Sequence, residues 1–350
     1  MEATSPPHRF NFSACWLNLL AWLLCKIYFS SLRIVGAPLR RQPRQLILCS
    51  HRNGAIDGYC VLQAFPQARF PLSVQLLRSP LLRLMFSGIP VVRQKDRERY
   101  GESASKYGNT IRAACEHLRS AGTLAMFPEG SSEWGPHPLP YEPGTARIVR
   151  MLLDKGMPLE VVPLGLFYRV PDRFRSSVEI LLGEPVVLPA RKDADLRTWE
   201  QEIHIALSSA LDAVSVNCPD TATFEQVERL ARIDADRGQS YALAFKRWEQ
   251  QAIQGLPDLS DGVSVPPRPP LWRLLCGLPG MALLAPVLLA GLLVGRKADA
   301  RNTVTFFRMA GGFAMALLWL PILVALFCFF PLPMLCWSLL ATAGWPMFKR

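Results

Sequence analysis

The sequence carries little charge for its length, and one sign predominates. Of its 350 residues only 19% are charged, and 39 Lys and Arg face 28 Asp and Glu, a formal charge of +11 at pH 7. Half of the residues are hydrophobic and the mean hydropathy is +0.16, so part of the chain is expected to lie in lipid. The charge suits an anionic membrane surface or anionic small substrates. Because no zinc-finger, homeodomain or RNA-recognition signature occurs, no nucleic-acid partner is expected.

The patterns of disulfide scaffolds, metal sites and hydrolases are also missing. The nine Cys residues include no Cys-x-x-Cys pair, and several lie in apolar runs, which is typical of buried free thiols in a reducing compartment. The five His residues are scattered without ligand spacing, so neither a metal nor another cofactor is expected. An α/β-hydrolase needs a Gly-x-Ser-x-Gly elbow, and the nearest stretch, residues 101–105, lacks the final Gly.

Residues 45–190 show the alternation of an α/β domain, for which we predict a layered mixed sheet flanked by helices. Apolar residues recur at helical spacing in 103–120 and 145–155. Short apolar or β-branched runs between them are predicted strands: Gln45–Ser50, Leu72–Leu76, Ile89–Val92, Thr123–Phe127, Leu159–Leu166 and Val178–Leu182.

The segments on either side of this domain differ from it in composition. Residues 1–44 contain the apolar stretch Trp16–Phe29, too short for a comfortable bilayer span, which indicates an interfacial helix followed by a linker. A signal peptide is less favoured because no small-residue cleavage site follows. Residues 191–256 are a charged helical extension, predicted as two helices over 198–214 and 223–254, and the Pro- and Gly-rich residues 257–271 are a linker.

Residues 272–350 are predicted to be membrane-embedded. They contain three hydrophobic blocks, Leu274–Val294, Met309–Phe330 and Leu332–Phe348, of which the first two are long enough to cross a bilayer. The first block contains Pro279, Gly280 and Pro286 and is expected to be re-entrant or interfacial. Basic loops tend to stay in the cytoplasm, and four basic residues separate the first two blocks: Arg296, Lys297, Arg301 and Arg308. We therefore expect the last two blocks to form a hairpin and the α/β domain to face the cytoplasm.

The first segment with catalytic character is His51 to Asp57, directly after an apolar strand. Imidazole is the natural general base near neutral pH, and a carboxylate can fix its tautomer. Six positions apart, the two side chains cannot share a face of one regular helix, but the Asn53-Gly54 turn can bring them together. The alternative interpretation is a core histidine beside an aspartate that caps the following helix.

Three further segments end strands or begin a helix with groups suited to phosphate. Glu129 can accept hydrogen bonds from an acceptor hydroxyl, while Gly130 and Ser131 offer a close backbone and a donor. Arg93 follows another strand, and a guanidinium matches phosphate oxygens. Arg147 stands near a predicted helix N-terminus. Taken singly, these segments could be a turn, a solvated surface charge and a helix start.

Taken together, the segments resemble the four blocks of the glycerolipid acyltransferase superfamily in their usual order, across about residues 45–185. The blocks are the strand with its His…Asp pair, the Arg block, Phe-Pro-Glu-Gly, and the apolar Val-Val-Pro-Leu at 161–164. Five residues rather than the more common four separate His51 from Asp57, which resembles the glycerol-3-phosphate/dihydroxyacetone-phosphate acyltransferase branch. Ser131-Ser132 stands where lysophosphatidate acyltransferases often have Thr-Arg.

The resemblance implies transfer of a fatty acyl group from acyl-CoA or acyl-carrier protein to a phosphorylated glycerol acceptor, at a membrane. It implies that His51 deprotonates the acceptor and Asp57 holds His51. Arg93, Glu129, Gly130, Ser131 and Arg147 would bind substrate. The acceptor stays open between glycerol 3-phosphate and a lysophospholipid such as 1-acyl-glycerol 3-phosphate. A non-catalytic, lipid-binding membrane scaffold is the more distant alternative.

Overall fold

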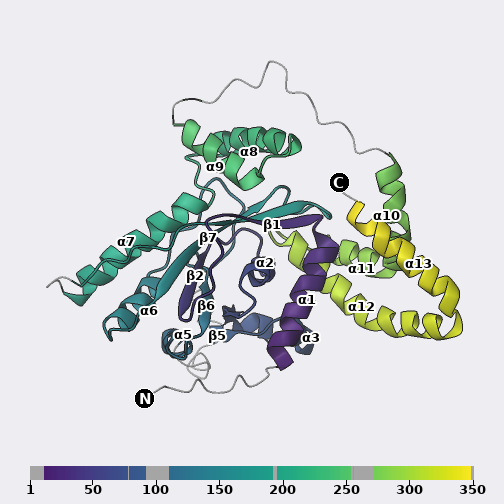
Figure 1. The fold of residues 1–350 in the computed structure, drawn as a ribbon, viewed down its shortest axis with the longest axis horizontal. Coiled ribbons are helices and arrows are strands. Elements are labelled where there is room, and N and C mark those ends of the chain that lie inside the picture. Colours follow the sequence, from purple (N-terminus) through teal and green to yellow (C-terminus); the bar gives the residue numbers. More distant parts are fainter. Residues whose placement is uncertain are drawn as a thin grey trace.

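The computed structural model describes residues 12–77, 79–91, 110–191, 195–253, 255 and 271–347. The α/β part begins with α1 and ends with α9 (Figure 1). Its strands are β1 (Ser31–Gly36), β2 (Gln45–Cys49), β3 (Ala68–Arg69), β4 (Pro71–Ser73), β5 (Ile89–Val91), β6 (Thr123–Met126), β7 (Glu160–Tyr168) and β8 (Ser177–Leu182). Its helices are α1 (Phe12–Tyr28), α2 (Ile56–Ala64), α3 (Pro80–Met85), α5 (Thr110–Arg119), α6 (Gly144–Leu153), α7 (Leu196–Val214), α8 (Thr221–Asp236) and α9 (Tyr241–Gln251).

Six strands form one mixed sheet in the order β1-β8-β7-β2-β6-β3, which confirms the predicted fold class. β2 runs parallel to both β6 and β7, and β7 pairs antiparallel with β8. A separate parallel pair joins β4 to β5, and a 3-10 turn at Val74–Leu77 replaces the second half of the strand predicted over Leu72–Leu76. The predicted strand boundaries otherwise hold to within two residues, because these runs are buried and apolar.

The sheet has two covered faces, and β2 shows how one strand serves both. Successive side chains point to opposite sides of a strand. Ile47 and Cys49 pack with α1, α2 and the start of a C-terminal helix, whereas Leu46 and Leu48 pack with α5, α6 and α7. All five residues of β2 are buried, so the strand is central and its carboxyl end is held rigidly.

The domain extends beyond the predicted start at residue 45. β1 pairs in parallel with β8 over its whole length, Ser31 opposite Ser177 and Gly36 opposite Leu182. Residues 31–36 are therefore part of the sheet rather than of the predicted linker. Helix α1 packs on α2 through one side and leaves Leu19, Trp22 and Leu23 between 40% and 50% exposed, an arrangement that suits the predicted interfacial position.

The charged extension contains three helices where the sequence predicted two. α8 ends at Asp236, the chain turns at Gly238 with φ 90°, and Ser240 caps α9 by accepting from Leu243 N. α7 and α9 pack on the sheet and α8 packs on α9, through buried side chains that include Trp199 on α7, Phe224 on α8 and Phe245 on α9. They complete the second helical layer instead of projecting from the domain.

The C-terminal region consists of α10 (Leu271–Leu283), α11 (Ala285–Gly295), α12 (Val304–Phe329), α13 (Pro331–Gly344) and a 3-10 turn at Trp345–Met347. α10 and α11 meet at a 90° bend, as the Pro and Gly residues of the first hydrophobic block indicated. Within the described residues, α12 alone is an unbroken helix long and apolar enough to span a membrane. α11 pairs with α12 and α10 with α13, on the side of the domain where α1 lies (Figure 1), and α12 buries Met309 and Phe313 in the domain core.

Candidate active site

The loop between β2 and α2 brings His51 and Asp57 together. β2 ends at Cys49, Gly54 takes a left-handed conformation with φ 62°, and Asp57 lies in the first turn of α2. Asp57 N donates to Gly54 O at 3.2 Å, which closes the turn. As a result Nδ1 of His51 lies 2.8 Å from Oδ2 of Asp57.

The Asp57 carboxylate is fully buried and surrounded by donors. Oδ2 accepts from the backbone N–H groups of Arg52 at 2.7 Å and Asn53 at 2.9 Å, and Oδ1 accepts from the hydroxyl of Tyr168 at 2.6 Å. Burial and the charge of Asp57 raise the pKa of Tyr168 above its ordinary range, so its hydroxyl remains a donor. Backbone dipoles at the start of α2 also favour an anion there. The Asp57 carboxyl group is therefore held in one orientation by donors on both of its oxygens.

This environment sets the tautomer of His51. Oδ2 of Asp57 already accepts from two backbone N–H groups, so its contact with His51 is that of an acceptor with an Nδ1–H donor. Nε2 is then the basic nitrogen, and it bonds to none of the described residues. The ring stacks on Phe127 with centroids 4.5 Å apart, and its side chain is 18% exposed. Nε2 is thus available to a substrate hydroxyl.

Glu129 braces the backbone of this loop. Oε1 accepts from His51 N at 2.7 Å, and Oε2 accepts from Leu139 N at 3.3 Å. Burial raises the pKa of Glu129 to about 7, against the opposing effect of the His51 hydrogen bond. Next to it, Gly130 has φ 64° and donates to Phe127 O, so the turn after β6 needs a residue without a Cβ. Ser131 follows in the same turn and is half-buried.

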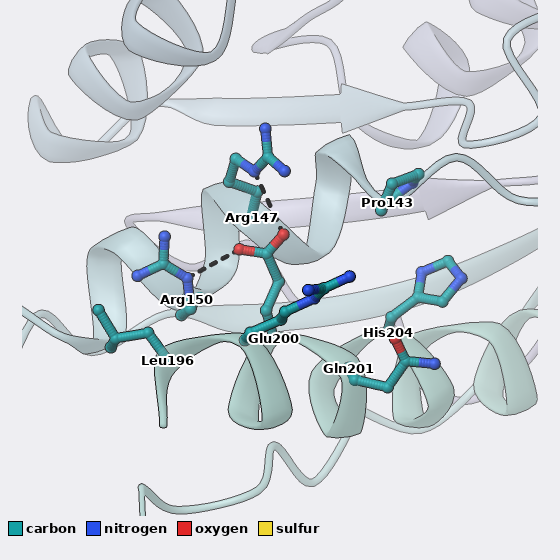
Figure 2. A pocket seen from close by; sticks show the side chains of 8 residues that line it. Pro143, Arg147, Arg150, Leu196, Glu200, Gln201 and His204 are labelled. Atoms are coloured by element: carbon teal, nitrogen blue, oxygen red, sulfur yellow. Dashed lines mark hydrogen bonds and ion pairs between the residues drawn. The ribbon is translucent and has the colours of Figure 1, made fainter. Parts of the chain in front are cut away.

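The other two predicted substrate ligands do not join this cluster. Arg93 lies outside the described residues. Arg147 lies on α6 in a groove between α6 and α7 (Figure 2), where its Nε bonds to Glu200 at 3.2 Å and half of its side chain is exposed. The structure gives Arg147 a basic setting, with Arg150 bound to the same Glu200 carboxylate.

Three residues of the site, Tyr168, Arg52 and Asn302, were not predicted as site residues from the sequence. Tyr168 binds Asp57 from β7. Arg52 is only 2% exposed, stacks over the Trp134 ring at 4.7 Å and donates to Gly135 O. Its Nε and Nη2 have no hydrogen-bond partner among the described residues, and burial lowers its pKa. Asn302 reaches the site from the link between α11 and α12. Each comes from a distant segment or points away from the motif, which spacing cannot reveal.

His51 and Asp57 are arranged as a general base and its carboxylate partner. Among the described residues no group of three or more His, Cys, Asp or Glu side chains is placed to hold a metal ion. An imidazole with a free Nε2 beside a buried carboxylate can remove a proton from a hydroxyl and later return it to a leaving group.

The part of the chain that contains this site is similar to a known family. Residues 31–166 match the Acyltransferase family, and the match begins where β1 begins. Glycerol-3-phosphate O-acyltransferases 2 and 1 of Saccharomyces cerevisiae are 30% and 28% identical over 139 and 142 residues. The chain therefore contains an Acyltransferase domain that is similar to part of these glycerol-3-phosphate O-acyltransferases. An uncharacterized acyltransferase of Schizosaccharomyces pombe is also similar, with 30% identity over 123 residues, 33% of this chain and 18% of that protein.

The alignments cover only part of each protein. Each alignment with the two S. cerevisiae proteins covers 37% of this chain and 19% of the relative, so the chain spans about a fifth of the curated relatives it matches. Among solved structures, the 1-acyl-sn-glycerophosphate acyltransferase PlsC of Thermotoga maritima aligns with a TM-score of 0.39 and 14% identity, over 56% of this chain and 78% of that one.

Proposed function

We propose that this protein transfers a fatty acyl group from a thioester, acyl-CoA or acyl-carrier protein, to a hydroxyl of glycerol 3-phosphate or a lysophospholipid in phospholipid synthesis. The observation that carries the proposal is the hydrogen-bonded pair of His51 and Asp57 inside a matched acyltransferase domain. The relatives named as glycerol-3-phosphate O-acyltransferases favour glycerol 3-phosphate as acceptor.

In the mechanism, Nε2 of His51 takes the proton of the acceptor hydroxyl as its oxygen attacks the thioester carbonyl. Asp57 stabilises the imidazolium that forms. The tetrahedral intermediate then collapses, the carbon–sulfur bond breaks, and the thiolate takes the proton back from Nε2. The products are an ester and a free thiol, and His51 is regenerated. Arg93, Gly130 and Ser131 are proposed to contact the acceptor, and Glu129 to hold the loop on which His51 lies.

Membranes that contain the protein test this with labelled acyl-CoA and one acceptor at a time: glycerol 3-phosphate, dihydroxyacetone phosphate or 1-acyl-glycerol 3-phosphate. His51→Ala and Asp57→Asn are each expected to lower the rate by at least about 100-fold, since both remove general-base catalysis. His117→Gln is the matched control, because that ring bonds Thr123 O at the opposite end of β6.

The responding acceptor would identify the reaction step, and activity only with acyl-carrier protein would identify the donor. Equal rates for the wild type and His51→Ala with both donors would contradict the mechanism. No transfer by the wild type with any acceptor and either donor would contradict the proposed activity and favour a lipid-binding scaffold.

We further propose that the domain faces the cytoplasm. Asn302, between α11 and α12, bonds to Ser132 beside the site, so the basic link and the site lie on one side of the membrane. Basic links favour the cytoplasmic side. A membrane-impermeant maleimide should label the exposed Cys15 only after the membrane is opened; labelling in sealed cells would refute this orientation.

A further inference from the structure

A basic groove runs between α6 and α7, beside the site but separate from it. Its cavity measures about 570 Å³, a volume in the range of small-molecule and cofactor sites. Its charged lining consists of Arg147 and Arg150 from α6 and Arg197, Glu200 and His204 from α7 (Figure 2). With His204 neutral, three guanidinium groups and one carboxylate leave a charge of +2.

The guanidinium groups keep free donors. Arg147 and Arg150 each use Nε to bond to Glu200, at 3.2 and 2.8 Å, so one carboxylate orients both side chains (Figure 2). The Nη groups of both, and the whole guanidinium of the exposed Arg197, make no hydrogen bond or ion pair with the described residues. Such groups match the oxygens of phosphate esters.

The groove also has a fixed relation to the reacting groups. It begins at Pro143, the residue before α6. The preceding Glu142 donates its N–H to Pro128 O, next to Glu129. Neither His51 nor Asp57 lines the groove. A small acceptor carries its phosphate too close to the reacting hydroxyl to reach along α6, whereas in acyl-CoA the long pantetheine arm separates the thioester from the nucleotide phosphates.

We propose that the α6–α7 groove binds the nucleotide phosphates of CoA in the acyl donor, an inference that rests on the proposed acyl transfer. The test is steady-state kinetics of Arg197→Gln and of Arg147→Gln, with Arg229→Gln, an exposed Arg on α8, as the control. Each groove variant should raise the KM for acyl-CoA on the order of tenfold, since a charge-assisted contact is lost. The kcat and the KM for the acceptor should stay unchanged.

A second readout separates this proposal from the proposed activity. Equilibrium dialysis of the detergent-solubilised His51→Ala protein against labelled CoA measures binding without turnover. Arg197→Gln and Arg147→Gln combined should weaken the binding of CoA on the order of tenfold or more. If CoA binds equally well with and without the two arginines, or if the acceptor KM rises instead, the groove proposal is overturned whether or not the protein transfers acyl groups.

A second inference concerns the link between α11 and α12, which docks on the catalytic loop. Nδ2 of Asn302 donates to Ser132 O at 2.8 Å and to Ser132 Oγ at 3.0 Å, and Asn302 is only 7% exposed. On its other side, a Cβ at Gly54 would lie 3.2 Å from Asn302 O. The residue therefore fills the space between the turn after β6 and the turn that joins His51 to Asp57.

The first turn of α12 strengthens this contact. Thr305 is fully buried, and its hydroxyl donates to Pro171 O at 2.6 Å. The side chain of Asn53, in the catalytic loop, donates to the same carbonyl oxygen at 3.2 Å. The first turn of α12 and the His51 loop thus donate hydrogen bonds to the same oxygen, Pro171 O.

We infer that Asn302 is a positioning residue, which holds Ser132 and the Gly54 turn in register so that His51 and Glu129 keep their arrangement. Asn302→Ala and Asn302→Asp should both lower kcat on the order of tenfold, because a small misplacement of reacting groups slows catalysis strongly. The Asp variant is expected to fail because a carboxylate cannot donate to Ser132 O. KM values should not change.

Thr303→Ala is the matched control in the same link, since its hydroxyl bonds only Asp299 and Ala300 within that link. A double-mutant cycle with Ser132→Ala should be non-additive, as expected for residues in contact. If Asn302→Ala lowers the melting temperature and the activity in proportion, or leaves kcat at the wild-type value, Asn302 does not position the site.

Discussion

The ionisation of Glu129 should leave a measurable mark on stability. Its side chain is 6% exposed, and burial raises its pKa from 4.5 to about 7. A carboxyl group whose pKa is higher in the folded state contributes stability that is fully present below the unfolded pKa and lost as pH rises through the folded pKa. At 1.36 kcal/mol per pH unit, the free energy of unfolding should fall by about 3 kcal/mol as the pH rises from the unfolded pKa to the folded pKa, and stay at that lower value above pH 7.

Glu129→Gln removes this titration and keeps a carbonyl acceptor for His51 N; only the longer bond from Leu139 N is altered. Thermal unfolding of detergent-solubilised protein is the assay. Between pH 5 and pH 8 the melting temperature of the wild type should fall relative to that of Glu129→Gln, by roughly 2–4 °C for each kcal/mol. The exposed Glu142 supplies the control, Glu142→Gln, which should follow the wild type. Parallel pH profiles for wild type and Glu129→Gln would refute the reasoning, because Glu129 would then be equally ionised in both folded and unfolded states.

Two further substitutions test packing and polar contacts. Tyr168→Phe removes the 2.6 Å hydrogen bond to the buried carboxylate of Asp57, so the free energy of unfolding should fall by about 1.5–3 kcal/mol in denaturant titrations; no change would mean that the bond adds nothing. Gly344→Leu should loosen α13 from α10 and lower the melting temperature by several degrees, since even a Cβ at Gly344 would lie 1.8 Å from Cys276 O. Gly144→Ala is the control, because a Cβ at Gly144 would have no atom within 4 Å. Equal melting temperatures for the two variants would contradict this packing.

Local patterns predicted the parts of the fold that depend on local forces. β2, β6 and β7 are buried apolar runs, and their pairing follows from that burial. β1 is not a buried apolar run, because Arg33 and Ile34 are exposed at the edge of the sheet, so its sequence did not predict a strand. The break between α8 and α9 depends on a single positive-φ glycine, Gly238, inside an otherwise continuous helical pattern.

In the candidate site too, the contact within one loop was predictable from the sequence and the contacts between distant segments were not. Five residues separate His51 from Asp57, and the Asn53-Gly54 turn signal among them indicated the contact that the structure contains. Tyr168 and Asn302 approach from 111 residues beyond Asp57 and 170 residues beyond Ser132. Such contacts depend on the order of strands and on the docking of α12, neither of which a single sequence specifies. The binding roles of Arg93, Gly130, Ser131 and Arg147 remain predictions.

The two ends of the C-terminal hairpin constrain how it enters a membrane. At the start of α12, Asn302 bonds to Ser132; after α13, Trp345 O accepts from the buried Arg175, whose guanidinium lies 5.0 Å from the Trp345 ring. Both ends are therefore fixed to the same domain. A chain that leaves the domain and returns to it crosses the bilayer twice or not at all.

With 14 residues α13 is about 21 Å long, less than the roughly 30 Å of the hydrocarbon core. The hairpin is thus expected to enter the membrane and turn back, with Leu318 and Leu332, 67% and 73% exposed, facing lipid. Because the bent α10–α11 pair packs on the same hairpin, a domain on the cytoplasmic side is compatible with the arrangement of all four helices.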